Sequence, residues 1–338
     1  MTVTRAPRRR WRRRRRVAGH TLFLLVSLAS LYLLLPSLLE VFTSWRELFA
    51  LAPEWVAVAL GVEALSFVAI WELQRIALQT GSRLPVALSQ LSGTSVGRVI
   101  PGGAATAGAL QYRMLLRAGL PGGRIAPALA GVSILLFGTV LALPLLSVPA
   151  IVAGTPVERG LVQAVAVGMG FFVVILAAGA TVFVWDRPLV LTGDLIERAV
   201  NRTVRRRRPV RGLPDLLVKE RDSLRRAFGR RWKAALLAAA GRSILDYLAL
   251  VACLRAVGAE PSPSLVLLAY VAASILGMIP LTPGGLGFVE AGLTGMLALA
   301  GVGAAAAAVA TLAYRLVSFW LPIPAGGVAY GIFRYRFR

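Results

Sequence analysis

Long apolar runs alternate with short polar connections along the chain. Six of these runs are long enough to cross the hydrocarbon core of a bilayer, which requires about 20 residues. The first run is full length and lacks the small-residue cleavage site of a secretory signal, so we expect it to be a retained helix. The six runs cover residues 20–42, 55–78, 125–147, 160–185, 232–257 and 303–333.

Two further apolar stretches, residues 86–120 and 264–302, are each interrupted near the middle by Pro-Gly-Gly. The interruptions are Pro101-Gly102-Gly103 and Pro283-Gly284-Gly285. Each half of such a stretch has about 15–17 residues, so a helix of that length reaches only about 22–26 Å and falls short of the core. The pattern therefore predicts two broken helical hairpins, each entering the membrane and returning to the same face.

The basic residues predict how these segments are oriented. The chain carries a formal net charge of +23, and its arginines gather in residues 5–16, 187–233 and 334–338. Basic loops stay on the cytoplasmic side of a membrane. An alternating path that starts in the cytoplasm places every basic cluster, and both termini, on that side. The same path opens the two hairpins from opposite faces.

The sequence also shows signs of an internal repeat. The 182-residue offset between Pro101 and Pro283 superposes the two interruptions and the runs on either side of them. It places Glu63 one position from the equivalent of Asp246. With the opposite orientation of the hairpins, this predicts an inverted-topology repeat, the plan of many secondary transporters.

The expected fold class is an all-α polytopic membrane protein with about six full transmembrane helices and two broken re-entrant hairpins. We expect four parts: residues 1–18, a cytoplasmic Arg-rich arm; residues 19–185, the first membrane half with broken hairpin 86–120; residues 186–232, a basic cytoplasmic linker with an amphipathic helix from Pro214; and residues 233–338, the second membrane half with broken hairpin 264–302 and a short basic tail.

Charged residues inside apolar runs are the candidates for a functional site, because charge in a membrane is costly. A break in a helix also frees backbone N–H groups and positive dipole ends, which suit a phosphate. The primary candidates lie at or near the breaks and in the last run, and the secondary ones lie deeper in the other segments. The primary set is Arg98, Pro101, Gly102, Gly103, Pro283, Gly284, Gly285, Gly287, Glu290 and Arg315, and the secondary set is Glu63, Glu72, Arg113 and Asp246.

Two interpretations of these charges stay open. In the first, Arg98 and Arg315 hold an anionic headgroup in a midplane cavity, while Glu290 and Asp246 balance charge or carry a proton. In the second, Glu290 complements a helix dipole and pairs with an arginine, and Asp246 is neutralised by Arg242, one helical turn before it. Arg113 could equally extend to the inner interface.

Enzyme chemistry has few residues to use. Cys253 is the single cysteine and His20 the single histidine, so cysteine or histidine metal clusters are excluded. The sequence has no GxxxxGK[ST] nucleotide loop. We therefore expect no enzyme activity, no cofactor and no metal. A membrane enzyme with Glu290 as acid or base is a weaker alternative.

The second half of the chain carries a family resemblance. The segments IPLTPGGLGFVEAGLTGML and LAYRLVSFWLPIPAGGVAYGIF resemble the transmembrane domain of the lysylphosphatidylglycerol synthase/flippase family, with its PxTPGGxGxxE block and later arginine helix. The resemblance extends from about residue 20 to the end. It assigns the motif to Pro283, Gly284, Gly285, Gly287, Glu290 and Arg315. The first half departs from the family pattern, because Gln111 and Arg113 are the first polar side chains after Thr106.

The resemblance implies a flippase-like translocase that moves an anionic or aminoacylated phospholipid between leaflets of the inner membrane of a prokaryote. Bifunctional members add a soluble aminoacyl-transfer domain, which we do not expect after residue 338. Membrane lipids are the expected partners, and nucleic acid is not, because basic blocks beside membrane helices typically touch anionic headgroups.

Other interpretations remain open. A translocase of undecaprenyl-phosphate-type carrier lipids or lipid-linked sugars would use the same arginines, and a membrane scaffold would recruit a soluble partner through the basic linker. A homo-oligomer, or a separately encoded lipid-modifying enzyme or glycosyltransferase as partner, is also open.

Overall fold

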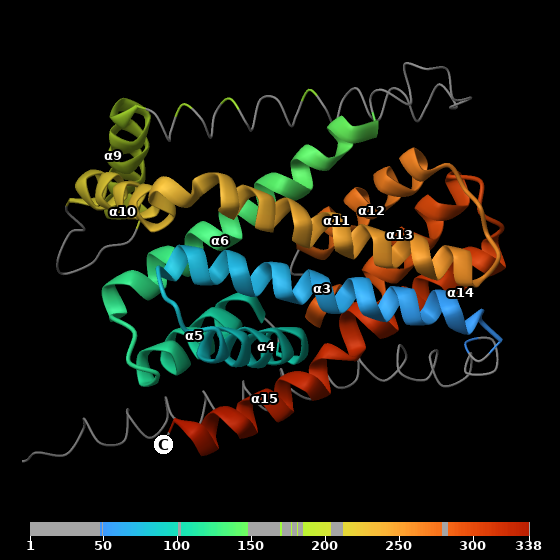
Figure 1. Cartoon of the computed structure of the whole chain (residues 1–338). Helices are drawn as coiled ribbons and strands as arrows, with labels where there is room; N and C mark the ends of the chain where they lie inside the picture. The colour runs from blue at the N-terminus through green and yellow to red at the C-terminus, as the bar shows by residue number, and fades with distance from the viewer. Residues whose placement is uncertain are drawn as a thin grey trace, which may run out of the picture.

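The computed structural model describes residue 48, residues 50–100, 103–147, 185–203, 212–278 and 283–337, and a few isolated positions between 148 and 185. All regular secondary structure in these ranges is helical (Figure 1). The first half contains α3 (Pro53–Leu78), α4 (Leu84–Val99), α5 (Gly103–Arg117), α6 (Gly122–Ala142) and the short 3₁₀ helix η1 (Leu143–Ser147). The linker contains α9 (Asp186–Thr203), α10 (Leu213–Phe228) and η2 (Gly229–Arg231), and the second half contains α11 (Trp232–Ala256), α12 (Pro263–Met278), η3 (Pro283–Gly285), α13 (Phe288–Leu299), α14 (Ala304–Arg315), the π-helical turn η4 (Leu316–Trp320) and α15 (Pro322–Arg336).

Four segments are long and apolar enough to cross a membrane. They are Pro53–Leu78, Gly122–Leu145, Gly229–Ala256 and Ala304–Arg336, which confirms four of the six predicted runs. The run at 20–42 and nearly all of the run at 160–185 lie outside the described residues, so the count of six stays a prediction. The described part of the linker holds two helices where we expected one: α10 begins near Pro214 as predicted, and α9 was not foreseen.

The two interrupted stretches each form a pair of short helices. Helices α4 and α5 pack against one another, as do α12 and α13. In Figure 1 the α4–α5 pair lies towards one end of the bundle and the α12–α13 pair towards the other. The tip of the first pair is tight, because a Cβ at Gly103 would overlap the carbonyl oxygen of Gly97.

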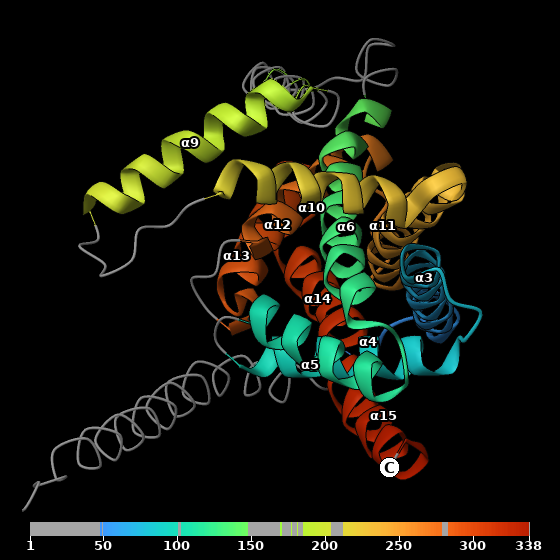
Figure 2. The same ribbon diagram turned by 90° about the vertical axis from the view of Figure 1, so that its left-hand side faces the viewer.

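Helices α3 and α11 pack closely against one another and run side by side in both ribbon views (Figures 1 and 2). Small residues line their contact, which is how membrane helices approach closely without a hydrophobic driving force. Ala59 and Ser66 of α3 and Ala235, Ala239 and Ala249 of α11 are all fully buried. Glu63 lies between Ala59 and Ser66 on the same buried stripe, so the helix contact itself carries a carboxyl group inward.

The two halves also hold one another through reciprocal contacts. Helix α15, at the end of the second half, packs along α4 of the first pair, and η1, which ends α6, packs on α12 of the second pair. On α4, Ser92 and Ser95 donate hydrogen bonds to the carbonyl groups of Gly326 and Ile323 at 3.4 and 2.8 Å. Side-chain donors thus satisfy carbonyl groups of a helix that begins with a proline-containing turn.

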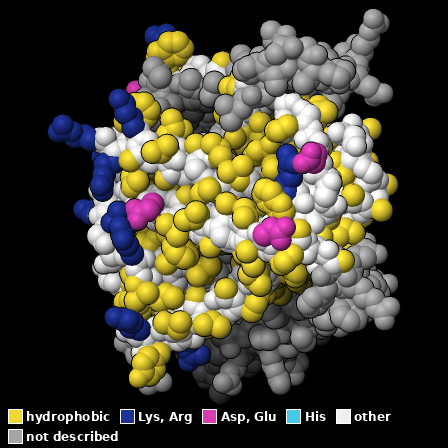
Figure 3. Space-filling model, turned by 45° about the vertical axis from the view of Figure 1, so that its right-hand side comes forward, with side chains coloured by type: hydrophobic (Ala, Val, Ile, Leu, Met, Phe, Trp, Pro, Cys, Tyr) yellow, Lys and Arg dark blue, Asp and Glu magenta, His cyan; other side chains and the backbone are white. Residues whose placement is uncertain are grey.

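The outer surface matches a bilayer environment. Large hydrophobic side chains such as Leu65, Ile134 and Leu237 are more than half exposed on the long helices. Figure 3 shows a broad apolar face with Lys and Arg side chains gathered at one edge. Such a surface would be unstable in water but suits lipid.

The linker helices form a separate polar contact. Arg221 of α10 is buried and bonds Asp186, the first residue of α9, and Asp222, the latter at 2.9 Å. The hydrogen bonds to Asp186 and then Asp222 raise the pKa of Arg221 above its ordinary value. The guanidinium therefore stays charged and ties the start of α9 to α10.

Candidate functional site

A cavity of about 400 Å³ lies inside the bundle, where elements of both halves meet. A volume of this size suits a small ligand or a lipid headgroup. Helix α4 contributes Arg98 to its wall and α6 contributes apolar side chains, while η3, η4 and helices α11 to α14 supply the rest. Its polar side chains are Arg98, Arg242, Ser243, Asp246, Tyr270, Ser274, Tyr314 and Arg315.

Arg315 is the most firmly held of the three arginines. It is buried at the end of α14, and its Nε donates to Glu290 Oε1 at 2.6 Å. Its Nη2 donates to the carbonyl oxygen of Gly284 at 3.2 Å, and its guanidinium lies 4.1 Å from the centre of the Phe319 ring. One arginine therefore binds the second break through the backbone, the first turn of α13 through Glu290, and η4 through an aromatic face.

Arg98 reaches the same aromatic ring from the other half of the chain. Its Nη1 donates to the carbonyl oxygen of Phe319 at 2.7 Å, and its guanidinium is 5.1 Å from the ring centre. Phe319 belongs to η4, a π-helical turn, and such turns are frequent at functional sites. Pro322 and Pro324 remove two N–H donors just beyond it, which leaves carbonyl groups of this turn in need of side-chain donors.

The second break fits closely around this ring. Gly284 has φ 61°, a left-handed conformation that favours glycine, and a Cβ there would overlap the edge of the Phe319 ring. Gly285 and Gly287 also have positive φ, at 74° and 76°. The glycine-rich break is thus shaped to bring its backbone against Phe319 and Arg315.

A second polar group lies on the α11 side of the cavity. Arg242 and Asp246, one turn apart, approach to 3.2 Å between Nη1 and Oδ1. The other oxygen of Asp246 accepts hydrogen bonds from Tyr270 at 2.7 Å and Tyr314 at 3.1 Å. Both tyrosines are buried, so α11, α12 and α14 are joined at this carboxylate.

Glu63 of α3 lies behind this group. Its side chain is buried, its Oε1 lies 3.9 Å from Nη2 of Arg242, and neither of its oxygens has a hydrogen-bond donor among the described residues. A buried carboxyl group without a donor is costly. Either a proton or a mobile cationic partner is therefore needed to satisfy it.

The structure brings most primary candidates to one place. Arg98, Gly284 and Arg315 line the cavity, together with the secondary candidate Asp246, and Glu290 reaches it through Arg315. Pro283, Gly285 and Gly287 belong to the same break, whereas Gly103 lies at the tip of the first pair. Pro101 and Gly102 lie outside the described residues.

Two secondary candidates do not reach the cavity. Glu72 binds Arg75 at 2.6 Å and Arg83 at 3.4 Å near the end of α3. Arg113 is exposed on α5. Their positions agree with ion pairing and an interfacial side chain, because both lie near the end of the bundle where the basic loops gather.

Sequence reasoning missed the aromatic part of the site. Tyr270, Tyr314 and Phe319 looked like ordinary apolar positions, yet they bind Asp246 or face the arginines. One signal could have found the tyrosines: a deep carboxylate needs donors, and a phenol in an apolar run is a natural donor.

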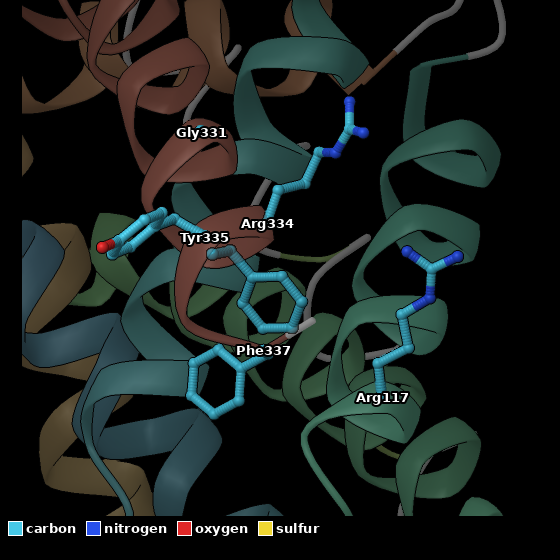
Figure 4. Close-up of a pocket in the computed structure, with 6 residues that line it drawn as sticks. Arg117, Gly331, Arg334, Tyr335 and Phe337 are labelled. Atoms are coloured by element: carbon cyan, nitrogen blue, oxygen red, sulfur yellow. The ribbon is translucent and has the colours of Figure 1, made fainter.

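A second hollow of about 650 Å³ lies at the end of the bundle, between α5 and α15. Arg117 and Arg334 face it together with Tyr335 and Phe337 (Figure 4). It contains none of the candidate residues and no carboxylate, so we place the candidate site in the inner cavity.

These features define the class of the protein: an all-helical, multi-pass membrane domain with a cavity between its helices that is lined by arginines. The chain belongs to the family described as the lysylphosphatidylglycerol synthase TM region, whose family model matches residues 20–326. The predicted resemblance is thereby confirmed.

Two similar proteins from Methanothermobacter thermautotrophicus are each named UPF0104 membrane protein. One is 38% identical over 86 residues, which is 25% of this chain and 25% of the relative. The other is 33% identical over 89 residues, 26% of this chain and 25% of the relative. The matches thus span about a quarter of these relatives.

Proposed function

We propose that this protein is a translocase for an anionic membrane lipid, which passes its phosphate-bearing headgroup through the inner cavity. One observation carries the proposal: Arg98, Arg242 and Arg315, contributed by both halves of the chain, converge on one cavity between membrane-spanning helices. Charges at such depth are rare and mark substrate pathways. Guanidinium groups are also the side chains best suited to phosphate.

The reciprocal packing of the halves supports an inverted repeat with two re-entrant hairpins, which would allow the cavity to open alternately to each face. In this proposal the basic end of the bundle and both termini face the cytoplasm of a prokaryote. No nucleotide or catalytic group takes part in this scheme.

The direct test is lipid movement in vesicles. The full chain is reconstituted into phosphatidylcholine vesicles with a trace of fluorescent phosphatidylglycerol, and the outer-leaflet label is bleached chemically. In vesicles that hold the wild type, we expect all of the label to be bleached, because inner-leaflet lipid is carried outward. Arg98→Gln should lower the rate of this lipid movement at least tenfold. Arg98 is the variant of choice because it bonds a single backbone carbonyl group and is only half-buried.

The matched control is Arg113→Gln, which removes an exposed arginine from α5 and should leave the rate unchanged. Equal rates in wild type and Arg98→Gln would overturn the proposed site. Competition by undecaprenyl phosphate would point to a carrier lipid as the substrate. A wild type that moves no anionic lipid would favour a scaffold role instead.

A further inference from the structure

Six charged groups cluster in and behind the cavity, and their balance is unusual. Arg98, Arg242 and Arg315 face three carboxyl groups, those of Glu63, Asp246 and Glu290. If all six are ionised, the cluster is neutral. It would then have no net attraction for an anion, although its donor groups suit a phosphate. One additional proton would leave a single positive charge.

The carboxyl pair Glu63 and Asp246 is the place where that proton fits. Both groups lie against the same guanidinium, that of Arg242, Glu63 at 3.9 Å and Asp246 at 3.2 Å, on helices that pack side by side. Both oxygens of Glu63 and Oδ1 of Asp246 lack a hydrogen-bond partner among the described residues, while Oδ2 of Asp246 already accepts hydrogen bonds from two tyrosines. A proton on Glu63, donated to Oδ1 of Asp246, satisfies both groups at once.

Among the described residues, Arg242 is the one basic group that forms an ion pair with either carboxyl group. Helix α11 presents Arg242, Asp246 and Cys253 to Glu63, α4 presents Arg98, and α14 presents Tyr314. Helix α12 reaches the pair through the bond of Tyr270 to Asp246. The α6 segment has only Arg124 as a charged residue, near its start, η4 has no titratable side chain, and α10 meets α3 near Gln79.

Arg242 therefore serves two carboxyl groups, while Arg98 is bonded to the carbonyl oxygen of Phe319. Arg242 approaches Asp246 to 3.2 Å and Glu63 to 3.9 Å, so it cannot neutralise both. The 182-residue offset places Glu63 one position from the equivalent of Asp246, and the paired helices α3 and α11 bring the two together. Each half of the chain thus contributes one carboxyl group to the pair.

We propose that Glu63 and Asp246 share one exchangeable proton, and that this proton is taken up together with one monoanionic phosphate group bound at Arg98 and Arg315. The proposal rests on the proposed function for its setting, since it names the coupling ion of the same cavity. The proton adds to a carboxylate oxygen of the pair and leaves from the same oxygen when the anion departs. Charge in the cavity is then the same with and without the anion.

The first test asks whether the shared proton exists. Infrared titration of the full chain in a maltoside detergent should show the carbonyl stretch of a protonated carboxyl group, which disappears as pH rises. The band should be lost in Glu63→Gln and kept in Glu54→Gln, whose carboxyl group is exposed on the same helix. Absence of the band from the wild type at every pH would overturn the proposal without reliance on any variant.

The second test asks whether proton and anion move together. Phosphatidylcholine vesicles holding the full chain and a trapped pH dye receive either short-chain phosphatidylglycerol or inorganic phosphate. For phosphatidylglycerol we expect proton movement, and a rate that rises up to about tenfold per pH unit of acidification, the limit for one coupled proton. Glu63→Gln should flatten this pH profile, and Glu63→Asp should restore it.

The outcomes separate the two proposals. Proton movement with inorganic phosphate alone supports the shared proton and contradicts a lipid substrate. Phosphatidylglycerol transfer with a flat pH profile and no proton movement overturns the shared proton and leaves the lipid translocase intact.

Discussion

At the scale of single residues, the contact between Glu290 and Arg315 tells most about the site. The pair is mostly buried, with 2.6 Å between Oε1 and Nε, and it fixes the first turn of α13 against the end of α14. The contact alone is compatible with a structural ion pair and with a lipid-binding arginine held in place by a carboxylate. Stability and transport respond differently to its removal.

We expect Arg315→Met to destabilise the protein by about 3–5 kcal/mol, because it leaves a buried carboxylate without its partner. The double variant Arg315→Met with Glu290→Met should recover most of this loss, since neither charge remains. Thermal unfolding in nanodiscs measures both. If the loss of stability in the double variant equals the sum of the losses in the two single variants, the two side chains do not interact directly.

Transport distinguishes the two roles of Arg315. If Arg315 binds the headgroup, the double variant is stable but moves no phosphatidylglycerol. If the pair is only structural, the double variant recovers transport together with stability, and Arg315 is then excluded from the proposed lipid-binding residues.

Gly284 gives a second prediction at the residue scale. Its positive φ and the adjacent Phe319 ring exclude a side chain, so Gly284→Ala should lower the melting temperature and cost at least about 1 kcal/mol of stability. Gly295→Ala is the matched control, because that glycine is helical and has open space around its Cβ direction. Equal melting temperatures for the two variants would show that neither the positive φ nor the Phe319 ring opposes a side chain at this position.

At the scale of elements, the contact between α4 and α15 depends on one glycine. A Cβ at Gly326 would overlap the carbonyl oxygen of Leu91 and the side chain of Ser95. We expect Gly326→Ala to push α15 away from α4 and weaken the bond from Arg98 to Phe319, with a lower melting temperature and slower lipid transfer. Gly327→Ala, one residue away in open space, should leave both unchanged. An unchanged melting temperature and transfer rate in Gly326→Ala would argue against tight packing of these helices.

The linker gives a second prediction at this scale. Asp186→Asn weakens the charged bond that holds the start of α9 to Arg221 of α10. Hydrogen exchange should become faster in residues 186–203 and stay unchanged in α3. Asp194→Asn, within the same helix, is the control. Equal exchange in the two variants would show that other contacts hold α9.

At the scale of the whole molecule, the charge at one end predicts orientation. Arg124 and Arg230 are exposed at the basic end, and Glu54 and Glu260 are exposed at the other. In a Cys253→Ala background, a cysteine at Glu54 or Glu260 should react with an impermeant maleimide added to intact cells, and a cysteine at Arg124 or Arg230 should react only after lysis. The reverse pattern would invert the proposed topology.

The sequence by itself determined the membrane class, four confirmed spans and the family. The length of an apolar run and the placement of charges are local properties, so they can be recognised without knowing how the helices pack. It also singled out Arg98, Glu290 and Arg315, because a charge in an apolar run is conspicuous wherever it falls.

Only the tertiary structure decided how those residues combine. It separated Glu72 and Arg113 from Asp246. Glu72 binds Arg75 near the end of α3 and Arg113 is exposed on α5, whereas Asp246 lies at the cavity. It also supplied Phe319 and the tyrosines, whose roles depend on which distant helices face them. The sequence shows that a charge falls in an apolar run and is therefore costly to bury. The residue that neutralises it lies in another helix, so only the packing of the helices identifies it.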